Sequence, residues 1–296
     1  MKGREGSAPP AAQCFTIAMR CFHPRPLLAA VLIVLASAVC EAAPSETWPE
    51  LNTDRDAFTP STFTVDPGRL LTEFSYVYID NRDARPTNSF PELLCRYAAN
   101  EWLEWRGGIN YAVGSQGNVV TSVEAGEVNE PGVTSYETSV LYGLKASLRD
   151  QRGLLPQACF IMEGDTPIRS ERLGTVPIAT LVAGWELPVV FPMRDARPWR
   201  LDGALRYSYL EGNAGWFSRW GPSTVLRMPV TDRFELHAEW FGTFSDGLPK
   251  ETSRPFFSPG GHIVLTKRFE IGLRVGWGLT PDAAPFFSDA GCAWRY

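Results

Sequence analysis

The chain has 296 residues, of which 21% are charged and 44% hydrophobic, and its 28 basic and 33 acidic side chains give a net charge of −5. This balance excludes an extensively disordered chain and a bundle of apolar membrane helices, and an acidic chain lacks the electrostatic footprint of a nucleic-acid-binding protein. Aromatic residues reach 12%, and the 26 Gly and 24 Pro favour many short strands over helices.

The first 42 residues have the pattern of a secretory signal peptide. A basic stretch precedes the apolar run from Leu27 to Val39, which is too short to cross a bilayer as a helix. Small residues follow this run and predict cleavage after Ala42 or after Ala38. Met19 is an alternative start, because a chain beginning there would have a presequence of ordinary length. We therefore predict an exported protein.

Residues 43–66 follow the signal peptide and lack the alternation seen further along the chain. Within them, the stretch PSETWPELNTDRDAFTPSTFTVD runs from Pro44 to Asp66. Two interpretations stay open at this point. The segment is either a plug that enters a barrel lumen from the periplasmic side or a flexible periplasmic leader, and the leader is the simpler expectation.

Residues 67–296 alternate between apolar and polar side chains in stretches of about nine to twelve residues. From Phe269 to Trp277, every second residue is apolar, whereas Glu270 and Arg274 lie on the opposite face. This period of two is typical of a strand. The same analysis predicts about twelve strands, at residues 69–80, 89–99, 103–111, 134–148, 155–164, 176–187, 199–209, 218–229, 233–244, 259–266, 269–277 and 286–296.

The periodicity fits either a soluble sandwich with its apolar faces in a core or a barrel with its apolar faces against lipid. Four features favour the barrel. The strands are long enough to cross a bilayer, and aromatic residues such as Trp199 and Tyr209 lie at both ends of an apolar face. Short turns alternate with longer connections, and the chain ends on the aromatic Tyr296. We predict an all-β fold, a transmembrane antiparallel up-and-down β-barrel of about 12 strands.

This topology places the short turns on the periplasmic side and the longer connections outside. The external connections are expected near residues 81–88, 112–133, 165–174, 210–217, 245–258 and 279–285. The predicted location is the outer membrane of a Gram-negative-type bacterium. The expected partners are outer-membrane lipid and the barrel-assembly machinery, which would recognise the C-terminal strand ending at Tyr296; no nucleic-acid partner is expected.

Several stretches of the chain together resemble a known family. They are GRLLTEFSYVYIDN, SFPELLCRYAANEWLEWRGGINY, GWELP, WRLDGALRYSY and the C-terminal TKRFEIGLRVGWGLTPDAAPFFSDAGCAWRY. From about residue 67 to the end, the chain resembles the outer-membrane β-barrel transporter family associated with the meta-pathway of phenol degradation. The resemblance implies a barrel that passes small organic molecules, and it carries over no catalytic residue.

The polar face of the predicted strands is rich in ionisable residues of both signs. The candidate lumen-lining residues are Glu104, Arg106, Arg200, Asp202, Arg206, Glu235, His237, Glu239, Glu270 and Arg274. Facing Glu and Arg groups can form a pore constriction, or they can pair to satisfy the interior and hold the strands in register. Three of the carboxylates, Glu104, Glu235 and Glu270, follow similar turns and are expected to form part of a ring near the inner mouth.

The predicted function is an outer-membrane channel or transporter for the passive passage of small molecules, and the family resemblance implies aromatic or hydrophobic compounds. A structural or adhesive barrel is the alternative. A lipolytic enzyme is the third option, but Ser258 and His262 lack the compact motif of such enzymes, so no enzyme is predicted. Cys95, Cys159 and Cys292 are far apart and are interpreted as small hydrophobic residues. No cofactor and no metal site are predicted.

Overall fold

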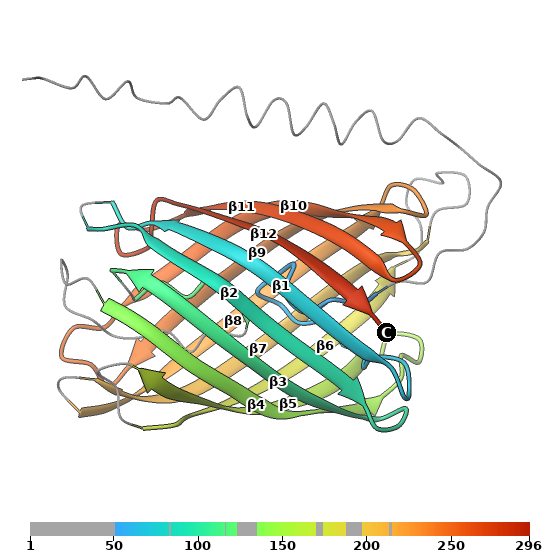
Figure 1. Cartoon of the computed structure of the whole chain (residues 1–296), viewed down its shortest axis with the longest axis horizontal. Coiled ribbons are helices and arrows are strands. Elements are labelled where there is room, and N and C mark those ends of the chain that lie inside the picture. The colour runs from blue at the N-terminus through green and yellow to red at the C-terminus, as the bar shows by residue number, and fades with distance from the viewer. Residues whose placement is uncertain are drawn as a thin grey trace, which may run out of the picture. The chain divides into compact units, whose positions relative to one another are not determined.

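The computed structural model describes residues 51–82, 84–115, 117–122, 135–169, 174–187, 197–212 and 215–296 (Figure 1). The predicted signal peptide, residues 1–42, therefore lies outside the described residues. Within the part of the chain that is described, no helix is both long and apolar enough to cross a membrane.

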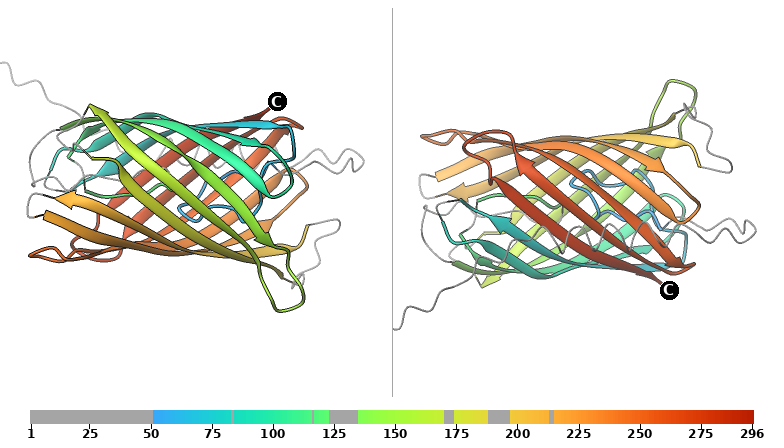
Figure 2. Two further views of the ribbon diagram at one scale, coloured as in Figure 1. Left: turned by 90° about the horizontal axis from the view of Figure 1, so that it is seen from below. Right: turned by 90° about the horizontal axis from the view of Figure 1, so that it is seen from above.

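Antiparallel strands close into a barrel in which each strand pairs with its neighbours along the chain, and the ladder between the first and last strands completes the circle (Figures 1 and 2). The twelve strands are β1 Leu70–Asp80, β2 Thr87–Ala98, β3 Leu103–Gly114, β4 Ser135–Arg149, β5 Gln157–Arg169, β6 Val176–Leu187, β7 Trp199–Gly212, β8 Gly215–Pro229, β9 Phe234–Asp246, β10 Ser253–Thr266, β11 Phe269–Gly278 and β12 Phe286–Arg295. The predicted fold is confirmed.

Side chains alternate between the inside and the outside of this barrel along each strand. On β7, for example, the outward Leu205 is 46% exposed, whereas the neighbouring inward Arg206 is 7% exposed. An apolar exterior around an ionisable interior reverses the arrangement of a soluble protein and is that of a transmembrane barrel. This pattern of exposure confirms the predicted barrel and excludes the soluble sandwich.

Exposed aromatic side chains lie near both ends of the barrel. We call the end that carries the start of β1 and the end of β12 the terminal end, and the opposite one the loop end. Trp105 and Trp294 lie near the terminal end, whereas Trp216 and Trp277 lie near the loop end, and all four are 44–56% exposed. Indole rings favour the boundary between lipid and water, so these residues mark two interfaces.

Three of the connections predicted as long external loops are shorter than expected. The ladder between β7 and β8 runs as far as the pair Gly212 and Gly215, so most of residues 210–217 is strand. Likewise, β5 runs on to Arg169, and β10 begins at Ser253 rather than at residue 259.

The early start of β10 has a simple physical reason. Pro lacks a backbone N–H and argues against a strand in a sequence, yet the ladder to β9 continues past both Pro255 and Pro259. The ladder to β11 instead skips Ser258 and Pro259. Hydrogen bonds on one side therefore hold this part of β10 in the sheet.

Residues 51–66, which we call the inner segment, run inside the barrel and end at the exposed Asp66 (Figure 2). Leu51, Asp54 and Phe58 in this segment are at most 3% exposed. The connection after β3 also turns inward: in residues 117–122, the inward loop, Val119 and Val120 are at most 2% exposed. The barrel interior is thus filled by chain that enters from both ends.

Candidate functional site: the filled barrel interior

The structure places all ten predicted lumen-lining side chains in the barrel interior, where they are 0–7% exposed. They are Glu104 and Arg106 on β3, Arg200, Asp202 and Arg206 on β7, Glu235, His237 and Glu239 on β9, and Glu270 and Arg274 on β11. Within this set, Glu104, Glu235 and Glu270 are each the second residue of their strand, at the terminal end. Most of these side chains contact the inner segment or the inward loop, so the interior charges bind these two parts of the chain.

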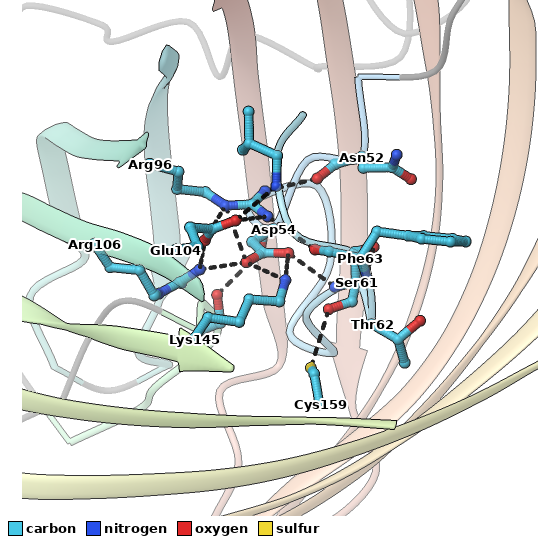
Figure 3. Close-up of polar contacts among 12 residues, drawn as sticks. Asn52, Asp54, Ser61, Thr62, Phe63, Arg96, Glu104, Arg106, Lys145 and Cys159 are labelled. Atoms are coloured by element: carbon cyan, nitrogen blue, oxygen red, sulfur yellow. Dashed lines mark hydrogen bonds and ion pairs between the residues drawn. The ribbon is translucent and has the colours of Figure 1, made fainter. Parts of the chain in front are cut away.

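Asp54 of the inner segment lies at the centre of the first group (Figure 3). Its carboxylate accepts hydrogen bonds from Arg106 and from Lys145 Nζ at 3.1 Å, and Arg96 Nε lies 3.4 Å away. Its other oxygen accepts the backbone N–H of Ser61 at 2.9 Å, which closes residues 54–61 into a loop. Burial would raise the pKa of Asp54, but the three cations outweigh that effect and hold the pKa well below its usual value.

Arg96 of β2 holds the two arms of this loop together. It donates to the carbonyl oxygens of Asn52 at 2.6 Å and Phe63 at 3.1 Å, on either side of Asp54 (Figure 3). Two strand carboxylates fix its guanidinium, Glu104 at 2.7 Å and Glu73 at 3.1 Å. One guanidinium therefore bridges the barrel wall and the backbone of the inner segment.

Wall carboxylates also accept backbone N–H groups of the inner segment. Glu73 accepts from two successive residues, Asp54 at 2.9 Å and Arg55 at 3.0 Å. Glu104 accepts from Val65 at 2.9 Å. Because these N–H groups have no strand partner, the carboxylates replace the ladder that an irregular segment lacks.

A second group joins the inner segment to the inward loop. Glu239 of β9 accepts the backbone N–H groups of Phe58 at 2.9 Å and Thr59 at 2.6 Å. Arg274 of β11 pairs with this carboxylate at 3.2 Å and donates to the carbonyl oxygen of Val120 at 2.5 Å. The inner segment and the inward loop are therefore both hydrogen-bonded to the Glu239–Arg274 ion pair.

An aromatic cluster surrounds Phe58 at this junction. Its ring stacks on Phe241 with centroids 4.6 Å apart and planes inclined by 11°. Phe241 in turn stacks on Phe256 at 5.1 Å and meets Phe287 edge-on at 5.9 Å. Phe58 therefore occupies an apolar, aromatic place next to the charged Glu239 and Arg274.

A third group of ions, also near the terminal end, joins β7 and β8 to the inner segment. Arg227 of β8 pairs with Asp56 of the inner segment at 2.6 Å and lies 3.7 Å from Asp202. Asp202 pairs with Arg200 at 3.0 Å, and Arg200 also donates to Gln157 at 2.8 Å.

Little space remains among these groups. A cavity between the inner segment and the wall formed by β1, β11 and β12 has a volume of about 30 Å³, enough for about two water molecules. In the described part of the chain, the inner segment and the inward loop thus occupy the barrel interior.

The described residues considered for the lipolytic and adhesive alternatives lie in other arrangements than those functions require. Ser258 and His262, which were considered for lipolysis, do not bond to each other: Ser258 donates to the carbonyl oxygen of Val275 at 2.8 Å, and His262 faces Asp56. The connection expected outside the barrel at residues 112–133, where an adhesive barrel would bind its partner, instead has residues 119–122 buried in the barrel.

Asp54 and Asp56 were missed by the sequence analysis, because a segment without alternation carries no sign of where its side chains point. Glu163 of β5, which accepts from Arg106 at 2.6 Å, was also missed, although the strand phase could have identified it as inward.

No protein-family model and no curated protein matches this chain. Several solved structures do, at low identity. An outer-membrane channel from Pseudomonas putida F1 covers 86% of this chain and 100% of its own with a TM-score of 0.54 and 10% identity. The translocator domain of the autotransporter NalP from Neisseria meningitidis follows at 0.49, 10% identity and coverages of 92% and 96%, and the NanC porin at 0.46, 8% identity and coverages of 76% and 98%.

The first of these likenesses shows a shared fold, the transmembrane barrel of outer-membrane proteins. The resemblance to the phenol-degradation transporter family stays a prediction, because no sequence relative bears on it.

Proposed function

We propose that this protein is an outer-membrane channel for small molecules and that its inner segment is a removable plug. The observation that carries the proposal is the use of the interior charges. If they served only to hold the strands in register, their ion pairs with one another would suffice. Glu73, Glu104 and Glu239 do pair with wall arginines, but they also accept backbone N–H groups of the inner segment, which has no strand pairing of its own.

Such contacts suit a segment that can leave. Backbone N–H groups and carboxylates are both well hydrated in water, so solvent can replace every hydrogen bond that withdrawal breaks. Withdrawal would leave a lumen lined by charges of both signs, and such a lining supports a water-filled passage. The shared fold with an outer-membrane channel supports the same conclusion.

The substrate class we favour is small aromatic compounds. Phe58 is the one aromatic side chain of the inner segment that stacks on the wall cluster of Phe241, Phe256 and Phe287 among the described contacts. When the segment withdraws, this place would accept another flat apolar ring. The family resemblance implies the same kind of compound.

The experiment is planar-bilayer recording of the mature protein, residues 43–296, beside a variant that lacks residues 43–66. We expect rare openings in the first and steady conductance in the second. Because the inward loop also fills the lumen, a third variant combines the deletion with a Gly-Ser replacement of residues 117–122. If the deletion variants fold but none of them conducts, the channel proposal is wrong and a structural barrel is favoured.

A further inference from the structure

One buried cluster has no part in the function proposed above. It consists of Asp56 on the inner segment, His237 on β9 and His262 on β10, and one ligand atom from each of them lies within 4.8 Å of the other two. The two histidines are the only ones beyond the predicted cleavage site. Three residues that are good metal ligands thus come together from three separate parts of the chain.

His237 is the unusual member of this cluster. Its side chain is 2% exposed, and neither ring nitrogen has a hydrogen-bond partner among the described residues. A buried polar group without a partner is costly and calls for an explanation. Opposite it on β10 is Gly260, where an added Cβ would lie 2.4 Å from the His237 Nε2 atom. The missing side chain at Gly260 makes room for this imidazole.

The surroundings supply the other features of a metal site. His262 Nδ1 lies 3.3 Å from the Asp56 carboxylate, and His262 Nε2 lies 3.8 Å from Glu235, its direct partner in the β9–β10 register. Arg227 donates to Asp56 at 2.6 Å. Hydrogen bonds of this kind orient a metal-binding carboxylate, and two carboxylates would offset the charge of a divalent ion.

We propose that Asp56, His237 and His262 bind a divalent transition-metal ion of the zinc type, and that the ion fastens the inner segment to the barrel wall. Imidazole and carboxylate ligands suit Zn²⁺, and a tetrahedral site with bonds of about 2.0–2.1 Å requires ligand atoms about 3.3 Å apart. The three ligand atoms therefore need to move together by about 1.5 Å at most, which side-chain rotation can supply. Glu235 or a solvent molecule would complete the coordination.

Zinc binding is measured first, on the untagged mature protein in detergent, by competition with a chromophoric chelator. We expect one Zn²⁺ per chain and a loss of affinity of about tenfold or more in His237→Gln and in Asp56→Asn, because each removes one of three protein ligands. His237→Gln is the cleaner variant, since His237 makes no side-chain hydrogen bond to the described part of the chain. Thr59→Ala is the matched control: it removes a hydroxyl bond to Glu239 in the same segment but no ligand, and it should bind Zn²⁺ normally.

Absence of stoichiometric binding would overturn the site, as would binding that His237→Gln and Asp56→Asn leave unchanged. Heat-modifiable migration in electrophoresis shows that each variant is folded.

The fastening role rests on the proposed channel, and its test separates the two. In bilayers, we expect Zn²⁺ to reduce the open time of the mature protein at least tenfold and EDTA to restore it, with no effect on His237→Gln or on the variant lacking residues 43–66. If the deletion variant conducts but Zn²⁺ leaves the mature protein unchanged, the fastening role fails and the channel stands. If no variant conducts yet binding depends on His237, the channel fails and the metal site stands.

Discussion

Asp54 shows how much of the interior depends on a single side chain. Its two oxygens accept hydrogen bonds from Arg106, from Lys145 and from a backbone N–H of its own segment, and the Arg96 guanidinium lies beside them. Without the Asp54 carboxylate, the buried cations Arg96, Arg106 and Lys145 would lose one of their negatively charged partners. Removing one partner of a buried ion group costs about 3–5 kcal/mol, mostly because the other charges stay buried.

We predict that Asp54→Asn loosens the inner segment. Cys159 provides a native reporter, since its Sγ is fully buried and faces the carbonyl oxygen of Ser61 at 3.8 Å. In a background without the other two cysteines of the barrel, a maleimide should label Cys159 faster by about 100-fold, which corresponds to about 3 kcal/mol. Asp66→Asn is the control, because Asp66 is 69% exposed and should leave the labelling rate unchanged. Equal rates in both variants would contradict the role given to Asp54.

Glycine at position 184 is required by the packing of the third charged group. An added Cβ there would lie 1.9 Å from Asp202 and 2.6 Å from Arg200, whereas at Gly203 the nearest atom would be 3.6 Å away. We predict that Gly184→Ala destabilises the barrel by about 1–3 kcal/mol through overpacking and that Gly203→Ala changes it far less. Urea unfolding in detergent, followed by tryptophan fluorescence, measures the difference. A smaller effect at 184 than at 203 would show that the ion pair can move aside.

The strands differ in how far their bounds can be predicted from neighbouring residues in the sequence. Strands such as β3 and β11 were predicted within a few residues, because period-two alternation is written into neighbouring positions. The start of β10 and the tight β7–β8 hairpin were not, because their hydrogen bonds come from partner strands and override local Pro and Gly signals. Boundaries depend on the neighbour as much as on the strand itself.

The last strand closes the barrel, and we predict that its end is needed for assembly. The Tyr296 N–H donates to the Leu70 carbonyl oxygen at 2.8 Å, and β12 pairs with β1 along its own whole length, from Phe286 opposite Asp80 to Arg295 opposite Leu71. Deleting residues 294–296 should reduce the amount of heat-modifiable barrel in outer membranes several-fold. Cys292→Ala, a change on the same strand, should leave it near normal. Unchanged assembly of the truncated chain would argue against recognition through this end.

The barrel as a whole has an apolar outer surface and an inner surface rich in charged side chains. Lipid-facing Leu205 pairs with Leu181 and Pro222 in the middle of its strand, whereas Leu154 lies in a turn at the terminal end and is 94% exposed. A charge costs about 2–4 kcal/mol at the bilayer midplane and about 0–1 near the interface. Depth in the membrane should therefore decide the effect of the same substitution.

We predict that Leu205→Arg impairs folding into lipid vesicles by about 2–4 kcal/mol and that Leu154→Arg has little effect. Urea titration of folding into vesicles measures both. Equal costs at the two positions would mean that the belt around Leu205 does not face lipid.

The alternation of residues 67–296 predicted about twelve strands and the ten ionisable side chains of their polar face, because the period of a strand is a property of neighbouring residues. Strand length, aromatic placement, the asymmetry of the turns and the terminal Tyr296 then predicted a barrel with that face inside. Which charges meet could not be predicted in this way. Contacts such as Glu239 with Thr59 join positions 180 residues apart and depend on strand register and closure. Only the tertiary structure decided that the inner segment fills the barrel, since a segment without period carries no local record of its partners.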